Sequence, residues 1–99
     1  MNRGAIMQKE MLKGEISPQG NPLPFDCIVL EDPETIKNPY SGESIELQPD
    51  AVAVYDCLKG AEYLAQGIDD GGHPLWCKVR EGLDWFREYY SKEYMVLLD

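Results

Sequence analysis

Residues 48–66 read QPDAVAVYDCLKGAEYLAQ, and this stretch predicts a helix that carries its own start signal. Pro49 suits the first helical turn, because its fixed φ is already helical and its missing N–H is not needed there. Asp50 follows it, at the positive end of the helix dipole. Projected on a helix, four apolar residues then form one stripe: Val54, Leu58, Ala61 and Ala65. We expect Gly67 to end this helix as a C-cap.

A second helix is predicted over residues 75–90. Its large apolar side chains recur at spacings of three and four, which is typical of a buried stripe: Trp76, Val79, Leu83, Phe86 and Tyr90. These aromatic residues would pack against the small alanines of the first helix, so the sequence predicts an antiparallel helical hairpin. Gly82, Trp85 and Tyr89 fall on the shoulder of the second stripe. There, Trp85 and Tyr89 either supply an interaction surface or are covered by the strands or the N-terminal arm.

Strands are expected before the first helix. FDCIVL, residues 25–30, is rich in β-branched and aromatic residues, and its continuous apolar run indicates burial on both faces. The turn NPYSGE, with Gly42 at positive φ, should join a short strand at 35–37 to a strand at 44–47. The fold class expected is therefore α+β, with a short antiparallel β-sheet or hairpin packed on an antiparallel two-helix hairpin.

The two ends of the chain are less clearly patterned. Residues 1–24 contain several glycines and the run SPQGNPLP, which indicates a flexible or partner-ordered arm in front of a single domain at 25–99. The apolar run at 94–98 should dock on the core or on a second subunit, and Ser91 could cap it. Its pattern fits a helix and a strand equally well.

Composition and charge restrict the class of function. The 99 residues carry a net charge of −9, which disfavours direct binding to nucleic acid or an anionic membrane. Residues 26–70 hold eleven acids and two lysines, so all of the excess negative charge lies in this segment. Such a segment either attracts a basic partner or only keeps a small protein soluble.

The three cysteines are widely spaced, and no secretion signal or membrane span is apparent. An odd cysteine count implies no disulfide framework, so we expect a reduced, cytoplasmic protein. Cys27 and Cys57 are interpreted as small hydrophobic residues.

One short string could carry chemistry: Asp69, Asp70, His73 and Cys77. These residue types can ligate zinc or activate a nucleophile. The string nevertheless contains no C-x-x-C and no second histidine, and Pro74 places His73 outside the helix. Cys77 should face Glu81 and other acids, which would oppose a thiolate. We therefore assign no catalytic residue, no metal ligand and no cofactor.

The function that the sequence favours is a small acidic protein-interaction or regulatory module, non-enzymatic and self-associating. Its expected partner is a second copy of the chain or another, basic protein. The interaction residues predicted are two aromatic and four acidic side chains: Trp85, Tyr89, Glu43, Glu46, Asp69 and Asp70.

Two other functions stay open. The first is an inhibitor that mimics nucleic-acid phosphates, which requires its carboxylates on one exposed face. The candidates for that face are Glu31, Asp32, Glu34, Glu43, Glu46, Asp50, Asp56, Asp69 and Asp70. The second is a small metal-dependent hydrolase centred on His73.

Overall fold

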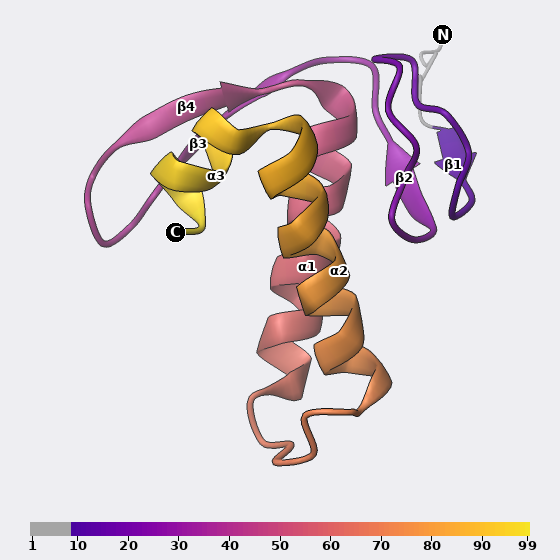
Figure 1. Cartoon of the computed structure of the whole chain (residues 1–99). Helices are drawn as coiled ribbons and strands as arrows, with labels where there is room; N and C mark the ends of the chain where they lie inside the picture. Colours follow the sequence, from indigo (N-terminus) through magenta and orange to yellow (C-terminus); the bar gives the residue numbers. More distant parts are fainter. Residues whose placement is uncertain (1–8) are drawn as a thin grey trace, which may run out of the picture.

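A computed structural model describes residues 9–99, and it shows an α+β fold (Figure 1). The two antiparallel sheets have two strands each and come first in the chain, followed by the three helices. The elements are β1 (Lys9–Met11), β2 (Cys27–Val29), β3 (Glu34–Lys37), β4 (Ser44–Leu47), α1 (Pro49–Ala65), α2 (Pro74–Tyr89) and α3 (Ser91–Leu97). Within residues 9–99, no helix combines the length and the apolar character that crossing a membrane requires.

Helices α1 and α2 form the predicted antiparallel hairpin, which is the long axis of the molecule in Figure 1. The α1 stripe is buried throughout, with Val54 and Ala65 fully inaccessible to solvent. Phe86 of α2 is equally inaccessible, and Val79, two helical turns before it, is also buried in the core. Both helices therefore bury an apolar face in the hairpin, as the sequence predicts.

The buried face of α2 is rotated from the predicted stripe. Gly82 and Trp85 are buried, whereas Leu83 and Trp76 are only half-buried. Gly82 faces Leu58 so closely that a Cβ atom at this position would lie 2.9 Å from the Leu58 Cβ. Placing Gly82 and Trp85 on the shoulder was wrong, because a stripe drawn only through large side chains overlooks the glycine that lets two helices approach.

Strands β3 and β4 form the expected hairpin, with Ile36 opposite Ile45. Its turn includes Gly42 at φ 81°, so the predicted left-handed glycine is confirmed. The C-terminal segment is the helix α3, and its buried Leu97 docks it on the core. The Asn38 side-chain amide donates to the Val96 carbonyl at 3.0 Å, which joins α3 to the hairpin.

Residues 9–24 belong to the fold, in contrast to the arm expected over residues 1–24. β1 pairs with β2, and Met11 and Leu23 are buried in the core. Trp85 donates from Nε1 to the Pro22 carbonyl at 2.7 Å, which ties this segment to α2. Residues 1–8 of the expected arm lie outside the described residues.

Two smaller expectations also fail. β2 is not buried on both faces, because Cys27 and Val29 are buried while Ile28 between them is exposed. α1 ends at Ala65 with Gln66 as its C-cap, and Gly67 is not among the glycines with positive φ. Here the Ile68 N–H bonds to the Ala65 carbonyl at 2.9 Å, so a turn ends the helix without a left-handed residue.

Candidate functional site

A groove of about 480 Å³ lies where the β1–β2 sheet meets α1, and we call it the acidic groove. It is lined by three carboxylates, two thiols and three apolar side chains: Glu10, Asp26, Asp56, Cys27, Cys57, Ile28, Leu30 and Ala53. No basic residue belongs to this lining. Its size is within the range of specific binding sites, which are mostly apolar with a few polar groups that orient the ligand.

The floor of the groove, formed by Cys27, Cys57 and Ala53, is apolar and has no reactive thiol. The pKa of the Cys27 thiol is raised to about 11, with burial as the main cause and the charge interaction with the nearby Cys57 as the second. Burial also raises the pKa of Cys57. A thiol reacts as its thiolate, so both cysteines are protonated and poorly nucleophilic at neutral pH. In the floor they therefore act as small hydrophobic surfaces.

Ile28 and Leu30 give the groove its exposed apolar surface. They are 53% and 45% accessible to solvent, respectively. Ile28 lies directly opposite Glu10 in the pairing of β2 with β1, so an apolar and an acidic side chain share the outward face of the sheet. β2 pairs with β1 alone among the described strands, so its second edge has no strand partner.

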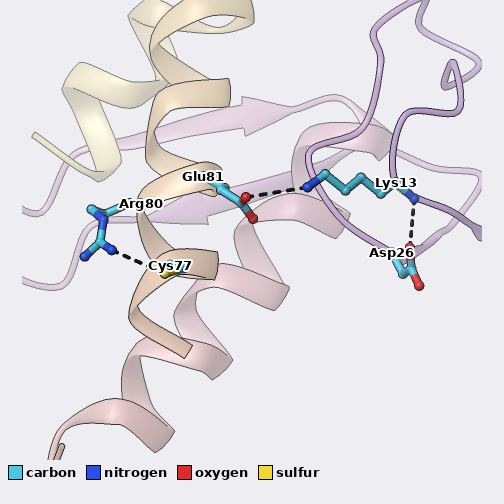
Figure 2. A network of polar contacts seen from close by, with 5 residues as sticks. All are labelled: Lys13, Asp26, Cys77, Arg80 and Glu81. Atoms are coloured by element: carbon cyan, nitrogen blue, oxygen red, sulfur yellow. Dashed lines mark hydrogen bonds and ion pairs between the residues drawn. The ribbon is translucent and has the colours of Figure 1, made fainter. Parts of the chain in front are cut away.

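The carboxylates of the groove are not neutralised by ion pairs within residues 9–99. Asp26 accepts the Lys13 backbone N–H at 2.8 Å, while the Lys13 ammonium lies 3.6 Å from Glu81 on α2 (Figure 2). Partial burial and the negative charge of Glu34 raise the pKa of Asp56. The three carboxylates therefore have no ion-pair partner within the described residues, although the positive charge of Lys78 acts on the Cys27 and Cys57 thiols.

A second hollow, of about 260 Å³, includes Lys9, Met11, Val29 and Glu31 in its lining. Its lysine and its glutamate have opposite charges, so this hollow has no net preference for a cation or an anion. The acidic groove is both the larger and the more strongly charged of the two.

A buried polar cluster surrounds Asp50 at the start of α1. One carboxyl oxygen accepts from the Ser17 hydroxyl at 2.7 Å and from the Asn21 amide at 3.0 Å, and the other accepts from the Tyr90 hydroxyl at 2.7 Å. The Asp50 backbone N–H donates to the Gln19 side chain at 3.0 Å. Burial and the bond to Asp50 raise the pKa of Tyr90, which keeps its hydroxyl proton in place.

Asp50 is fully buried and its carboxyl group is satisfied, so the Asp50 cluster (Ser17, Gln19, Asn21, Asp50 and Tyr90) is structural. It fastens residues 17–21 to the start of α1 and to the α2–α3 junction. The sequence placed Asp50 among the exposed acids, and that expectation is wrong. The signal that could have indicated burial is the apolar run 51–54 directly after it.

The aromatic residues predicted for interaction lie beneath or beside the N-terminal segment. Trp85 is only 5% exposed, so its ring offers no surface and the alternative, cover by the N-terminal segment, describes it. Tyr89 is half-buried, with its ring centroid 5.7 Å from that of Trp85. An interaction role for Trp85 is therefore not available in this fold.

The predicted acidic residues are exposed but do not share one place. Glu43 and Glu46 lie on the β3–β4 hairpin, whereas Asp69 and Asp70 lie in the α1–α2 loop at the opposite end of the molecule (Figure 1). Of the other exposed candidates for a phosphate mimic, Glu31, Asp32 and Glu34 lie between β2 and β3 or in β3, and Asp56 lies in α1. The one-sided carboxylate face that such an inhibitor requires is thus interrupted along the length of the hairpin.

His73 and Cys77 occupy separate surroundings at the start of α2. His73 caps the helix, because its Nδ1 accepts from the Leu75 N–H at 3.1 Å. The Cys77 thiol accepts from the Arg80 guanidinium at 3.4 Å, a basic neighbour that the sequence prediction did not include (Figure 2). Over residues 9–99, no three His, Cys, Asp or Glu side chains are arranged to hold a metal ion.

Sequence reasoning missed the acidic groove because its lining comes from β1, β2 and α1. A partial signal was present, since Asp26, Ile28 and Leu30 alternate along residues 25–30 and fall on one face of a strand. Reading this run as continuously apolar concealed that face.

Comparison of the chain with protein-family models, with curated proteins and with solved structures found no match.

Proposed function

We propose that this chain is a non-enzymatic protein-interaction module whose binding surface is the acidic groove. The observation that carries the proposal is the combination of an open hollow of about 480 Å³ with two exposed apolar side chains, Ile28 and Leu30, at its wall. Apolar side chains at a concave surface gain free energy when a partner removes them from water.

A protein segment suits this surface better than a small molecule buried on all sides. Ile28 lies in β2 and Leu30 directly follows the strand, and both are exposed, so they present a row of apolar contacts and not a closed cavity. Such a row supports contact with a length of polypeptide.

Self-association was expected through Trp85 and Tyr89, but the covered Trp85 ring cannot support it. The proposal therefore places the contact at the acidic groove. A second copy of the chain would also supply a protein segment to this groove. The mass of the chain in solution, and the dependence of the NMR signals of the groove residues on protein concentration, distinguish a second copy from another protein.

The test is selection of random displayed peptides on the full-length chain, followed by calorimetric titration of the selected peptides. Ile28→Thr keeps a β-branched residue in the strand and removes apolar surface from the groove, so we expect roughly ten-fold weaker binding, or about 1.4 kcal/mol. Ile16→Thr is the matched control, because Ile16 is similarly exposed at 60% and lies outside the groove lining. Equal binding to both variants and the parent chain would show that the groove is not the binding surface.

A further inference from the structure

The acidic groove combines three carboxylates with an apolar lining. The ion pairs of residues 9–99 are Lys13–Glu81, Lys59–Glu62 and Arg87–Asp84. None of them includes a groove carboxylate, and Lys78, whose charge acts on both floor thiols, has its ammonium 4.9 Å from the centre of the Phe25 ring. With three carboxylates in the lining and Lys78 as the basic group beside it, the groove keeps a net negative charge.

The like charges around Asp56 make a cation favourable at this place. Glu34 acts on Asp56 from β3, and Glu10 and Asp26 line the same hollow from β1 and from the residue before β2. A positive charge that enters beside Asp56 would offset both its partial burial and the negative charge of Glu34. The carboxylates of the groove thus select by charge, while Ile28, Leu30 and the buried lining select by apolar contact.

We propose that the groove binds a protein segment in which a lysine or arginine side chain stands next to an apolar side chain. This inference rests on the proposed function and names the chemistry of its partner. The cationic group lies among the carboxylates of Glu10, Asp26 and Asp56, and the apolar side chain covers Ile28 and Leu30. The aliphatic stem of a lysine or arginine suits the thiol and alanine floor.

Other positively charged ligands match the groove less well. A divalent metal requires several oxygen or sulfur ligands around one point, and no such arrangement exists within the described residues. A polyamine would use the carboxylates but leave Ile28 and Leu30 in water. A basic segment with a neighbouring apolar residue uses both features.

The experiment titrates the isotope-labelled full-length chain with four short blocked peptides and follows backbone amide signals by NMR. The first alternates lysine and leucine. The second replaces each lysine by acetyl-lysine, which keeps the stem and removes the charge. The third replaces each leucine by serine, and the fourth replaces each lysine by glutamate. We expect the first to bind at Cys27, Ile28 and Leu30, and each of the others to bind at least about ten-fold more weakly.

Charge variants of the protein locate the effect. Asp56→Asn should weaken the lysine–leucine peptide about ten-fold, which is ~1.4 kcal/mol, and Glu10→Gln on the opposite wall should act in the same direction. Asp69→Asn changes the net charge equally but lies in the α1–α2 loop, so it should leave binding within about two-fold. Equal weakening by Asp69→Asn would mean that the peptide responds only to the net charge of −9, and would overturn the inference.

The outcomes separate the two proposals. Equal binding of the acetylated peptide at the groove would refute the basic partner but keep the interaction function. Absence of groove shifts with all four peptides, together with failure of the displayed-peptide selection, would refute both. Groove shifts that appear when the protein alone is concentrated would identify a second copy as the occupant, which contradicts a basic segment from another protein.

Discussion

Gly82 offers a sharp test of how the two long helices meet. A Cβ atom added here would lie 2.9 Å from both Cβ and Cδ2 of Leu58, and 3.4 Å from Cε2 of Phe25. Leu58 is 1% exposed, so its side chain has no free space into which to move. The Leu58 Cβ can shift only with the backbone of α1. Gly82→Ala should therefore force the helices apart.

Two opposing effects set the size of the change. In a helix interior alanine is favoured over glycine by about 1 kcal/mol. Overpacking of a well-filled core costs roughly 1–3 kcal/mol. Because the clash involves an atom fixed to the backbone, we expect the larger part of that range, and a net loss of about 1–2 kcal/mol in the free energy of unfolding. For a domain of this size, that loss corresponds to a melting temperature lower by roughly 4–16 °C.

Gly60→Ala is the matched control, because Gly60 lies on the exposed side of α1 with nothing within 4 Å of an added Cβ. It should gain the helix propensity without the clash, and so stabilise the chain by up to about 1 kcal/mol. Urea unfolding followed by circular dichroism and by tryptophan fluorescence measures both variants. If Gly82→Ala were as stabilising as Gly60→Ala, the close approach of α1 and α2 would be refuted.

Two further predictions concern the Asp50 cluster. Tyr90→Phe removes a hydrogen bond to a buried carboxyl group and should cost about 2 kcal/mol in urea unfolding, whereas Tyr40→Phe, at a side chain 96% exposed, should change nothing. In alkali, the folded state holds the Tyr90 proton more tightly than the unfolded state, whose pKa is near 10.0, so stability should fall as the pH rises above that value. Tyr90→Phe should reduce this fall, and an identical alkaline slope in parent and variant would contradict the assigned hydrogen bond.

Local patterns predicted much of the helical half of the fold. Pro49 starts α1, Pro74 starts α2, and the strand 44–47 has the predicted ends. In each case the deciding information lies within a few neighbouring residues, either as a proline that suits a first turn or as a short β-prone run after a glycine turn. The antiparallel hairpin could be predicted because both helices carry an apolar stripe that needs a partner.

Long-range pairings were not predictable in this way. β1 has three residues and becomes a strand only because β2, sixteen residues further along, pairs with it. Asp50 looked like an exposed residue that favours the helix dipole, and its hydrogen-bond donors come from Ser17 and Asn21 in a stretch rich in glycine and proline. Such contacts join residues that are far apart in the sequence, and the local pattern of apolar and polar residues does not predict them.

The acidic groove depends on the Asp50 cluster through the segment that both share. Residues 12–24 contain none of the helices or of the strands β1–β4, yet they connect β1 toward β2. Their conformation must be fixed for Glu10 to lie opposite Ile28. Apolar contact alone is non-directional and would tolerate a shifted segment. Hydrogen bonds from Ser17 and Asn21 to a buried carboxyl group, and from Trp85 to the Pro22 carbonyl, are met in only one arrangement. A polar cluster in the interior therefore supports the strand pairing that forms the acidic groove on the outside.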